Sequence, residues 1–163
     1  MLNIRPATRD DVPTIKQLIG ELADFEHLQI SVTEERLARD GFGPEPKFRV
    51  LMAEWQNQPA GYAFFFDFYS TFEGRSGIFL EDVYVRPQFR GKGIGKELFA
   101  RIAKLGQEEH CFAVRWQVLD WNQAAIEFYE KLGGKFLNEW KTVQLDEESF
   151  QSVIGQPVIK GGR

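Results

Sequence analysis

The segment Leu80–Lys96 reads LEDVYVRPQFRGKGIGK and contains the strongest local signal in this chain of 163 residues. Val83–Val85 are strand-forming residues, and Pro87 ends the strand because proline cannot donate a hydrogen bond to a neighbouring strand. Glycines then recur at every second position: Gly91, Gly93 and Gly95. Because they lack Cβ atoms, the backbone N–H groups of this loop can approach a ligand closely.

A helix follows the glycine-rich loop. Apolar residues recur from here at helical spacing: Ile94, Leu98, Ile102 and Leu105. The N-terminus of a helix presents unpaired N–H donors and the positive end of the helix dipole to an anion. Cationic side chains lie in the same stretch: Arg90, Lys92 and Lys96. The segment therefore predicts a pyrophosphate site.

Two familiar phosphate-binding motifs do not fit the spacing. A nucleotide triphosphatase loop needs Ser or Thr after its Gly-Lys pair, but Gly95-Lys96 is followed by Glu97. A dinucleotide fingerprint needs Gly-x-Gly-x-x-Gly in the first strand–helix unit, but these glycines are spaced Gly-x-Gly-x-Gly and lie in mid-chain. The remaining alternative is a glycine-rich turn into an ordinary helix.

The rest of the chain predicts a mixed α/β fold around one twisted sheet. Alternating or continuous apolar patterns indicate strands at residues 2–6, 48–55, 61–69, 78–86, 112–119 and 140–145. Helical spacing and capping residues indicate helices at residues 12–25, 34–40, 94–109, 122–132 and 146–154. We expect the strands 78–86 and 112–119 to run parallel, joined by the helix 94–109 as a βαβ unit.

Composition indicates a single globular domain over residues 1–155 with a loose tail at 156–163. The hydrophobic content is 43% and the charged content is 27%. No apolar run can span a bilayer, no secretory signal is evident, and the single cysteine, Cys111, fits a reducing compartment, so we expect a cytoplasmic protein.

Charge and histidine content narrow the classes of partner. The net charge of −4 argues against nucleic acid and favours a cationic substrate. His27 and His110 lack Cys or His neighbours at ligand spacing, so we expect no metal site.

At this point the chain resembles a known family. Residues 90–95, Arg-Gly-Lys-Gly-Ile-Gly, are similar to the acetyl-CoA loop of the GCN5-related N-acetyltransferase (GNAT) superfamily, whose pattern is Gln/Arg-x-x-Gly-x-Gly/Ala. Four further segments resemble the spermidine/spermine (diamine/thialysine) branch: Ile4–Ala7, Tyr69–Phe72, Leu80–Asp82 and Trp121–Tyr129. The resemblance covers nearly the whole chain. It implies a mostly antiparallel twisted sheet with a central βαβ unit that binds acetyl-CoA.

The resemblance also implies which residues bind acetyl-CoA, the co-substrate. The strand backbone would hold the pantetheine arm at Val83, Tyr84 and Val85. The loop and the start of the helix would hold the pyrophosphate, with Arg90 nearby, through the N–H groups of Gly91, Lys92, Gly93, Ile94, Gly95 and Lys96. Asn122 would touch the far side of the arm, whereas Trp121 has either a contact or only a packing role.

Two residues are candidates for proton transfer. Glu81 follows the apolar run Ile78–Leu80, so its carboxylate could lie beside apolar surface with a raised pKa, and by resemblance it occupies the position of a base that acts through water. The alternative is that Glu81 only attracts the ammonium. Tyr129 matches the tyrosine that would protonate the departing thiolate, with packing against the cofactor arm as its alternative. No nucleophile of the protein is required, because nothing beside Cys111 would lower its pKa, so we expect direct transfer in a ternary complex.

The substrate expected is a primary amine of a small molecule: a diamine, a polyamine, or a lysine-like amino acid such as thialysine. Residues expected to bind it are Phe25, Glu26, Glu81 and Asp82, the last on the opposite face of a regular strand from Glu81. The loop Tyr69–Phe72 lacks the acid that spermidine enzymes carry, which favours shorter amines, and Arg75 could pair with an α-carboxylate. The resemblance also implies a homodimer, in which the region of Trp140 helps to build the substrate pocket of the neighbouring subunit. The alternatives are a protein or peptide acetyltransferase and a non-catalytic CoA-binding module.

Overall fold

One five-stranded sheet organises the first part of the chain in the computed structural model, which describes residues 1–155. The described chain divides into two compact units, Met1–Ala125 and a second that begins at Ile126. The strands lie in the order β1-β2-β3-β4-β5 within the first unit. Their bounds are Leu2–Pro6 (β1), Arg49–Trp55 (β2), Gln58–Ser70 (β3), Arg75–Val85 (β4) and Val114–Arg115 (β5).

Turn chemistry and crossover length explain the directions of the strands. Neighbours from β1 to β4 are antiparallel, and β2 and β3 are joined through Gln56 and Asn57, whose φ angles of 50° and 63° suit a tight hairpin. β4 and β5 are parallel, and helix α3, Ile94–Glu108, supplies the crossover between them. The expected mixed α/β fold with a central βαβ unit is confirmed.

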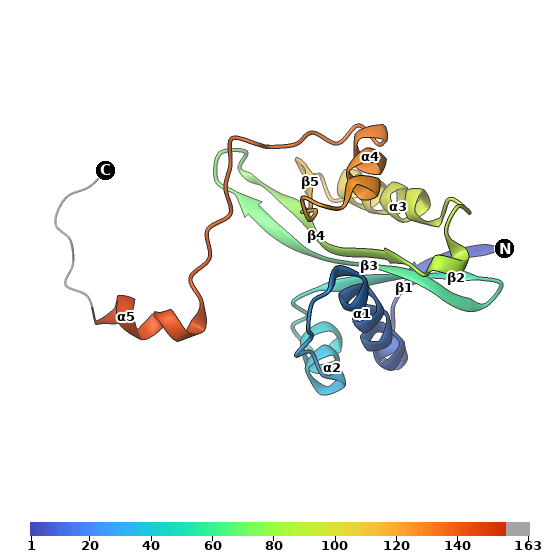
Figure 1. The fold of residues 1–163 in the computed structure, drawn as a ribbon, viewed down its shortest axis with the longest axis horizontal. Helices are drawn as coiled ribbons and strands as arrows, with labels where there is room; N and C mark the ends of the chain where they lie inside the picture. The colour runs from blue at the N-terminus through green and yellow to red at the C-terminus, as the bar shows by residue number, and fades with distance from the viewer. Residues whose placement is uncertain (156–163) are drawn as a thin grey trace. The chain divides into compact units, whose positions relative to one another are not determined.

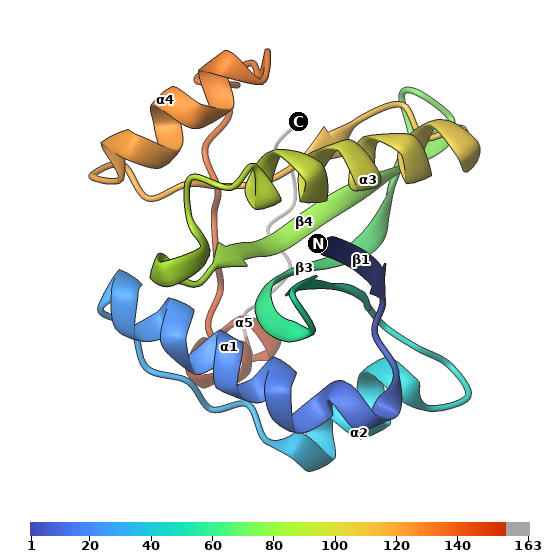
Figure 2. The same cartoon turned by 90° about the vertical axis from the view of Figure 1, so that its right-hand side faces the viewer.

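Helices cover both faces of this sheet (Figures 1 and 2). Helices α1, Val12–Glu26, and α2, Glu34–Phe42, lie on one face, and α3 lies on the other. The core on the α1 face is formed by one cluster of buried side chains: Val12, Ile15, Leu18, Leu37, Val50, Met52, Tyr62 and Tyr84. On α3 the predicted apolar positions Ile94, Leu98 and Ile102 are buried.

A bulge interrupts β4 at Glu81. Asp82 lies opposite Phe64 of β3, whereas Leu80 lies opposite the next residue, Phe65, so Glu81 has no cross-strand partner. Directly opposed residues share a face of the sheet, and consecutive residues of β3 alternate between faces. Leu80 and Asp82 therefore lie on opposite faces, although a regular strand would place them on the same one. The expected strand is confirmed, but its regularity at this point is not.

Two expected strands differ in the structure. The strand predicted at residues 112–119 is reduced to Val114–Arg115. Only these two residues pair with β4, and a segment without a paired neighbour is not part of a sheet. The strand predicted at residues 140–145 is absent from the second unit, within the residues described.

The helices predicted in the last third of the chain are confirmed. Helix α4, Gln123–Lys131, spans the boundary between the two units. The 3-10 turn η3, Glu147–Ser149, leads into α5, Phe150–Ile154. The predicted tail at 156–163 lies outside the described residues. In residues 1–155 no helix combines the length and the apolar character that crossing a membrane requires.

Candidate functional site

The site begins where β4 and β5 separate. Their pairing is limited to Ile78 with Val114 and Phe79 with Arg115. Beyond this point the rest of β4 pairs with β3 on one side, and the described residues provide no strand on the other. An open strand edge leaves backbone N–H and C=O groups available to a ligand.

The glycine-rich loop lies directly after this open edge. Gly91 and Gly93 have φ angles of 75° and 78°, and Gly93 is the N-cap of α3 without a side-chain capping bond. A Cβ atom placed on either glycine would meet nothing within 4 Å, so one side of the loop is open. The first recorded bond of the helix runs from Glu97 N–H to the Gly93 carbonyl. Residues 94–96 therefore present free N–H donors, as the first turn of any helix does.

The three cations near the loop have different surroundings. The Arg90 guanidinium donates from Nε to the Val85 carbonyl at 3.0 Å and lies 5.4 Å from the centre of the Phe25 ring. Lys92 Nζ lies 5.2 Å from the centre of the Trp55 ring, and Lys96 is exposed. The loop is therefore open to an anion, while the Arg90 side chain is fixed at its base and occupies one of the strand carbonyls expected to meet the cofactor arm.

The bulge separates the two acidic residues of β4. Glu81 is exposed, so the expectation that its carboxylate lies beside apolar surface is wrong. Asp82 is partly buried, and its Oδ2 accepts a hydrogen bond of 2.9 Å from the Tyr62 hydroxyl. Burial raises the pKa of Asp82 to about 6, and the hydrogen bond from Tyr62 partly opposes this rise.

Glu26 is the acidic residue of α1 at this site. It is the last residue of the helix and is partly buried, and burial raises its pKa. Its charge also raises the pKa of Asp82, which indicates that the two carboxyl groups are near one another. Within residues 1–155 no three acidic, His or Cys side chains gather closely enough to hold a metal ion. The carboxyl groups of Glu26, Glu81 and Asp82 bring negative charge to this part of the first unit, which attracts cations.

Aromatic side chains border the acids. The Phe25 ring lies 6.0 Å from the Trp121 ring, and His27, which caps α1 in the left-handed conformation, lies 6.3 Å from the same ring. Trp121 is half exposed, with 51% of its surface accessible. The structure thus brings Trp121 of the β5–α4 connection beside Phe25 of α1. Aromatic faces attract ammonium groups, so this wall also suits a cation.

Sequence reasoning missed Tyr62. It is fully buried and belongs to a strand rich in phenylalanine, so it was indistinguishable from core packing. The one available signal is chemical, because a buried tyrosine usually finds a hydrogen-bond partner.

Two predicted residues lie at α4. Asn122 Oδ1 accepts a bond of 3.3 Å from Ala125 N–H, so Asn122 caps the helix as expected. Tyr129 belongs to the second unit, where its ring makes an edge contact with Phe128 at 5.7 Å. Its role as a proton donor stays a prediction.

The β3–β4 turn lies far from the bulge along β4. Phe72 in this turn is 97% exposed, and Arg75 is the first residue of β4. Glu81 follows six positions later, about 20 Å along an extended strand. Arg75 is therefore too distant to pair with the α-carboxylate of a small amino acid whose amine is held at the bulge of the same chain.

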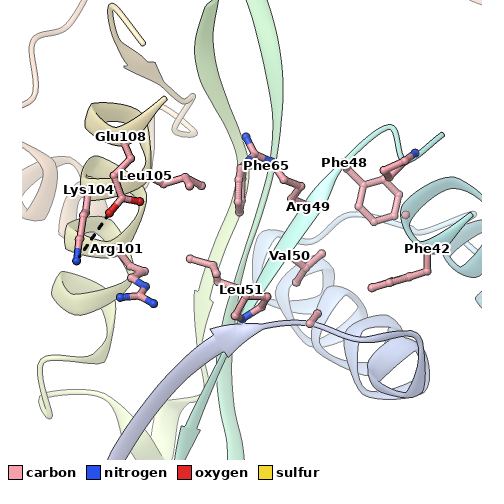
Figure 3. A pocket seen from close by; sticks show the side chains of 14 residues that line it. Phe42, Phe48, Arg49, Val50, Leu51, Phe65, Arg101, Lys104, Leu105 and Glu108 are labelled. Atoms are coloured by element: carbon pink, nitrogen blue, oxygen red, sulfur yellow. Dashed lines mark ion pairs between the residues drawn. The ribbon is translucent and has the colours of Figure 1, made fainter. Parts of the chain in front are cut away.

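A pocket of about 380 Å³ lies elsewhere in the first unit (Figure 3). It is lined by apolar side chains of the α2–β2 region, such as Phe42 and Phe48, and by Arg101, Lys104 and Glu108 of α3. None of the predicted site residues lines it, and Lys104 pairs with Glu108 at 3.8 Å. Volume alone does not make it the reactive site, since neither the glycine-rich loop nor Glu26, Glu81 or Asp82 lines it.

Comparisons with known proteins relate the chain to one family and one fold. Residues 14–134 match the model of the "Acetyltransferase (GNAT) family". The chain is 37% identical to the thialysine N-epsilon-acetyltransferase of Sus scrofa, over 94% of this chain and 97% of that protein. It is 29% identical to an L-ornithine N5-acetyltransferase of Arabidopsis thaliana, over 92% of this chain and 86% of that one. An integron cassette protein from V. cholerae shares the fold, with a TM-score of 0.79 at 19% identity over 95% of this chain and 98% of that chain.

Proposed function

Since this chain belongs to the acetyltransferase (GNAT) family and is an amine N-acetyltransferase, we propose that it moves an acetyl group from acetyl-CoA to a primary amine of a small molecule. The observation that carries this proposal is the continuity of three features along residues 81–96: an acidic bulge, an open strand edge and a glycine-rich helix start. In this order along the chain, the three features offer a site for a cation, backbone groups for hydrogen bonds and a site for an anion.

The residues present fit acetyl-CoA. The open space on Gly91 and Gly93 and the free N–H groups of the first turn of α3 suit a pyrophosphate. The edge of β4 at Val83–Val85 suits the amide groups of a pantetheine arm, and Lys92 and Lys96 add positive charge. Acetyl-CoA would supply an activated thioester, while the chain supplies binding, orientation and a path for the proton.

The proposed substrate is a short diamine or an amino acid with a side-chain amine. Glu26, Glu81 and Asp82 favour a cation, and the aromatic rings of Phe25 and Trp121 favour an ammonium group among them. The names of the two relatives point the same way, since thialysine and L-ornithine are both amino acids with a side-chain amine.

Direct transfer removes two protons from the substrate nitrogen, one from the ammonium before attack and one as the amide forms. At pH 7.4 only about 10⁻³ of an alkylamine is free base, so the ammonium must lose a proton to the enzyme. The freed nitrogen then forms a bond to the thioester carbonyl carbon, the C–S bond breaks, and the thiolate leaves with the electron pair. Backbone N–H groups at the open edge of β4 would stabilise the negative charge that develops on the carbonyl oxygen of the thioester when the nitrogen attacks. Tyr129 is our candidate for protonating the thiolate.

We further propose that the protein works as a homodimer. Large apolar side chains of the second unit are exposed, including Trp140 at 73%, Val143 at 92% and Leu145 at 50%. Exposed apolar groups close together in sequence are typical of an interaction surface. Light scattering on the purified protein tests this, and a mass of one chain at all concentrations would reject it.

An amine panel tests the activity. CoA release would be measured with thialysine, ornithine, lysine, putrescine, 1,3-diaminopropane, spermidine, spermine and a histone-tail peptide. We expect the highest kcat/KM with a small amine of three to five atoms between its charged groups. Turnover of the peptide alone would replace this proposal with a protein acetyltransferase. Tight acetyl-CoA binding without turnover of any amine would leave a binding module.

A further inference from the structure

We propose that Asp82, held in place by the Tyr62 hydroxyl, receives the proton that the substrate ammonium loses, and that Tyr62 is its positioning residue. This inference rests on the proposed function and names the group that performs one step of it. Glu81 then acts as an outer carboxylate that attracts the cation.

The Tyr62 side chain is built to orient Asp82. Tyr62 is fully buried, so the ring cannot turn its hydroxyl to solvent, and the hydroxyl donates to Asp82 Oδ2 at 2.9 Å. The bond runs diagonally, because Tyr62 lies directly opposite Tyr84 and Asp82 lies opposite Phe64. It therefore fixes one carboxylate oxygen from a rigid neighbouring strand.

The second oxygen of Asp82 is free for a substrate. The described residues make no other hydrogen bond to Asp82, and no fully buried side-chain oxygen among them lacks a partner. Asp82 Oδ1 therefore has no hydrogen-bond partner among the described residues and is not completely buried. A carboxylate that has one oxygen held by a hydrogen bond and the other without a partner has the geometry expected of a proton acceptor.

The groups that face Asp82 carry no compensating positive charge. Tyr62 faces it from β3, Glu26 from α1, and Glu81 precedes it on β4. Tyr84, two residues further along β4, has its ring beside Arg90, whose Nε is held by Val85. No ion pair to Asp82 is recorded within residues 1–155. A cationic substrate would supply the missing partner.

Burial supports the same assignment. Burial raises the pKa of Asp82 to about 6. The pKa of Asp82 thus differs less from that of an alkylammonium than the pKa of an ordinary carboxyl group does, which makes proton transfer from the ammonium to Asp82 easier. At neutral pH the group is still mostly ionised and able to accept. Glu81 is exposed at the bulge and has no cross-strand partner.

The step balances as follows. One N–H bond of the ammonium breaks and an O–H bond forms at Asp82 Oδ1. The freed lone pair forms the C–N bond, the C–S bond breaks, and the thiolate takes the electron pair. A second N–H bond breaks as the amide forms, and that proton ends on the thiolate, which becomes the thiol. The carboxyl proton of Asp82 leaves to water, which restores the carboxylate.

The experiment compares pH profiles of kcat/KM for the best amine of the panel, from pH 5.5 to 10, with acetyl-CoA affinity measured in parallel by calorimetry. The variants are Tyr62→Phe, Asp82→Asn and Glu81→Gln. Tyr69→Phe is the matched control, because it makes the same change on the same strand at an exposed position.

We expect Tyr62→Phe to keep the acetyl-CoA affinity and to move the acidic limb of the profile upward by about one pH unit, because the charged carboxylate loses a hydrogen bond. Asp82→Asn should lower kcat/KM at pH 7.5 by about 10² or more, with recovery toward pH 10 as the amine itself deprotonates. Glu81→Gln should mainly raise KM, and Tyr69→Phe should change neither quantity.

Two results would overturn the proposal while the wild type turns over the amine. One is an unchanged acidic limb in Tyr62→Phe. The other is a Glu81→Gln enzyme that shows the loss and alkaline recovery expected of Asp82→Asn. Absence of turnover in the wild type would instead reject the proposed function itself.

Discussion

Arg86 and Glu21 form a two-point ion pair, with Nε 2.9 Å from Oε2 and Nη2 2.7 Å from Oε1. The same guanidinium donates from Nη1 to the Pro59 carbonyl at 2.9 Å. Arg86 follows the last residue of β4, Glu21 belongs to α1, and Pro59 is the second residue of β3. One side chain thus joins the strand that enters the glycine-rich loop to the helix that carries Phe25 and Glu26.

Replacing Arg86 by alanine should destabilise the protein by about 1 to 2 kcal/mol, since the pair is two-pointed and only partly exposed. Glu21 has a lowered pKa because of Arg86, so the stabilisation is present at neutral pH and is lost as the pH falls through the lowered pKa. Urea unfolding at pH 7 and pH 3.5 measures this. The exposed pair of Arg39 with adjacent Asp40 offers the control, and Arg39→Ala should leave the urea midpoint almost unchanged, because solvent screens the pair. Equal losses in both variants would contradict the assignment.

Asp82→Asn should stabilise the fold at pH 7.5. The pKa of Asp82 rises from 3.8 to about 6 on folding, so the folded state holds its proton more tightly and wild-type stability falls as the pH rises between these values. The difference corresponds to at most about 3 kcal/mol, and we expect a gain of about 1 to 2 kcal/mol from the neutral amide. The gain should vanish below about pH 3, where the carboxyl is protonated in both states. Destabilisation at pH 7.5 would show that the charge is compensated in the folded protein.

Gly93→Ala should weaken acetyl-CoA binding. The φ angle of 78° strains any side chain, and the new methyl group would enter the open space proposed for the pyrophosphate. We expect KM for acetyl-CoA to rise about tenfold with little change in KM for the amine. Gly74→Ala is the matched control, because Gly74 has a φ of 64° and equally open surroundings in the β3–β4 turn. It should lose similar stability and keep its KM. If both variants bound acetyl-CoA normally, the loop would not be the anion site.

Two other glycines should respond in opposite directions. Gly20 lies inside α1, and a Cβ there would find Ile30 Cδ1 at a comfortable 3.8 Å, so Gly20→Ala should add about 1 kcal/mol of stability. A Cβ on Gly61 of β3 would collide with the Tyr84 carbonyl oxygen of β4. Gly61→Ala should therefore lower stability by about 2 kcal/mol or more, because the strands would have to separate. Thermal unfolding of both proteins decides this, and a tolerated Gly61→Ala would mean that the strands are more loosely paired than described.

Local patterns were sufficient for much of the site. The spacing of Gly91, Gly93 and Gly95 predicted a loop before a helix, and the structure places both there. The placement of Glu26 at a helix end was also predictable, because its apolar stripe ends there. The environment of Glu81 was not, since a bulge depends on how β4 aligns with β3 and leaves no mark in either strand alone.

The amino-acid sequence by itself determined most of the helices and strands, the hairpin between β2 and β3, and the glycine-rich loop before α3, because periodicity, turn residues and capping act over a few neighbouring residues. Only the tertiary structure decided which of two adjacent acids is buried, which buried tyrosine faces it, and where β5 leaves β4. Those outcomes depend on the register between strands far apart in sequence, and on burial, which is a property of the packed whole. Asp82 and Tyr62 are 20 positions apart, and their hydrogen bond exists because the sheet brings them together.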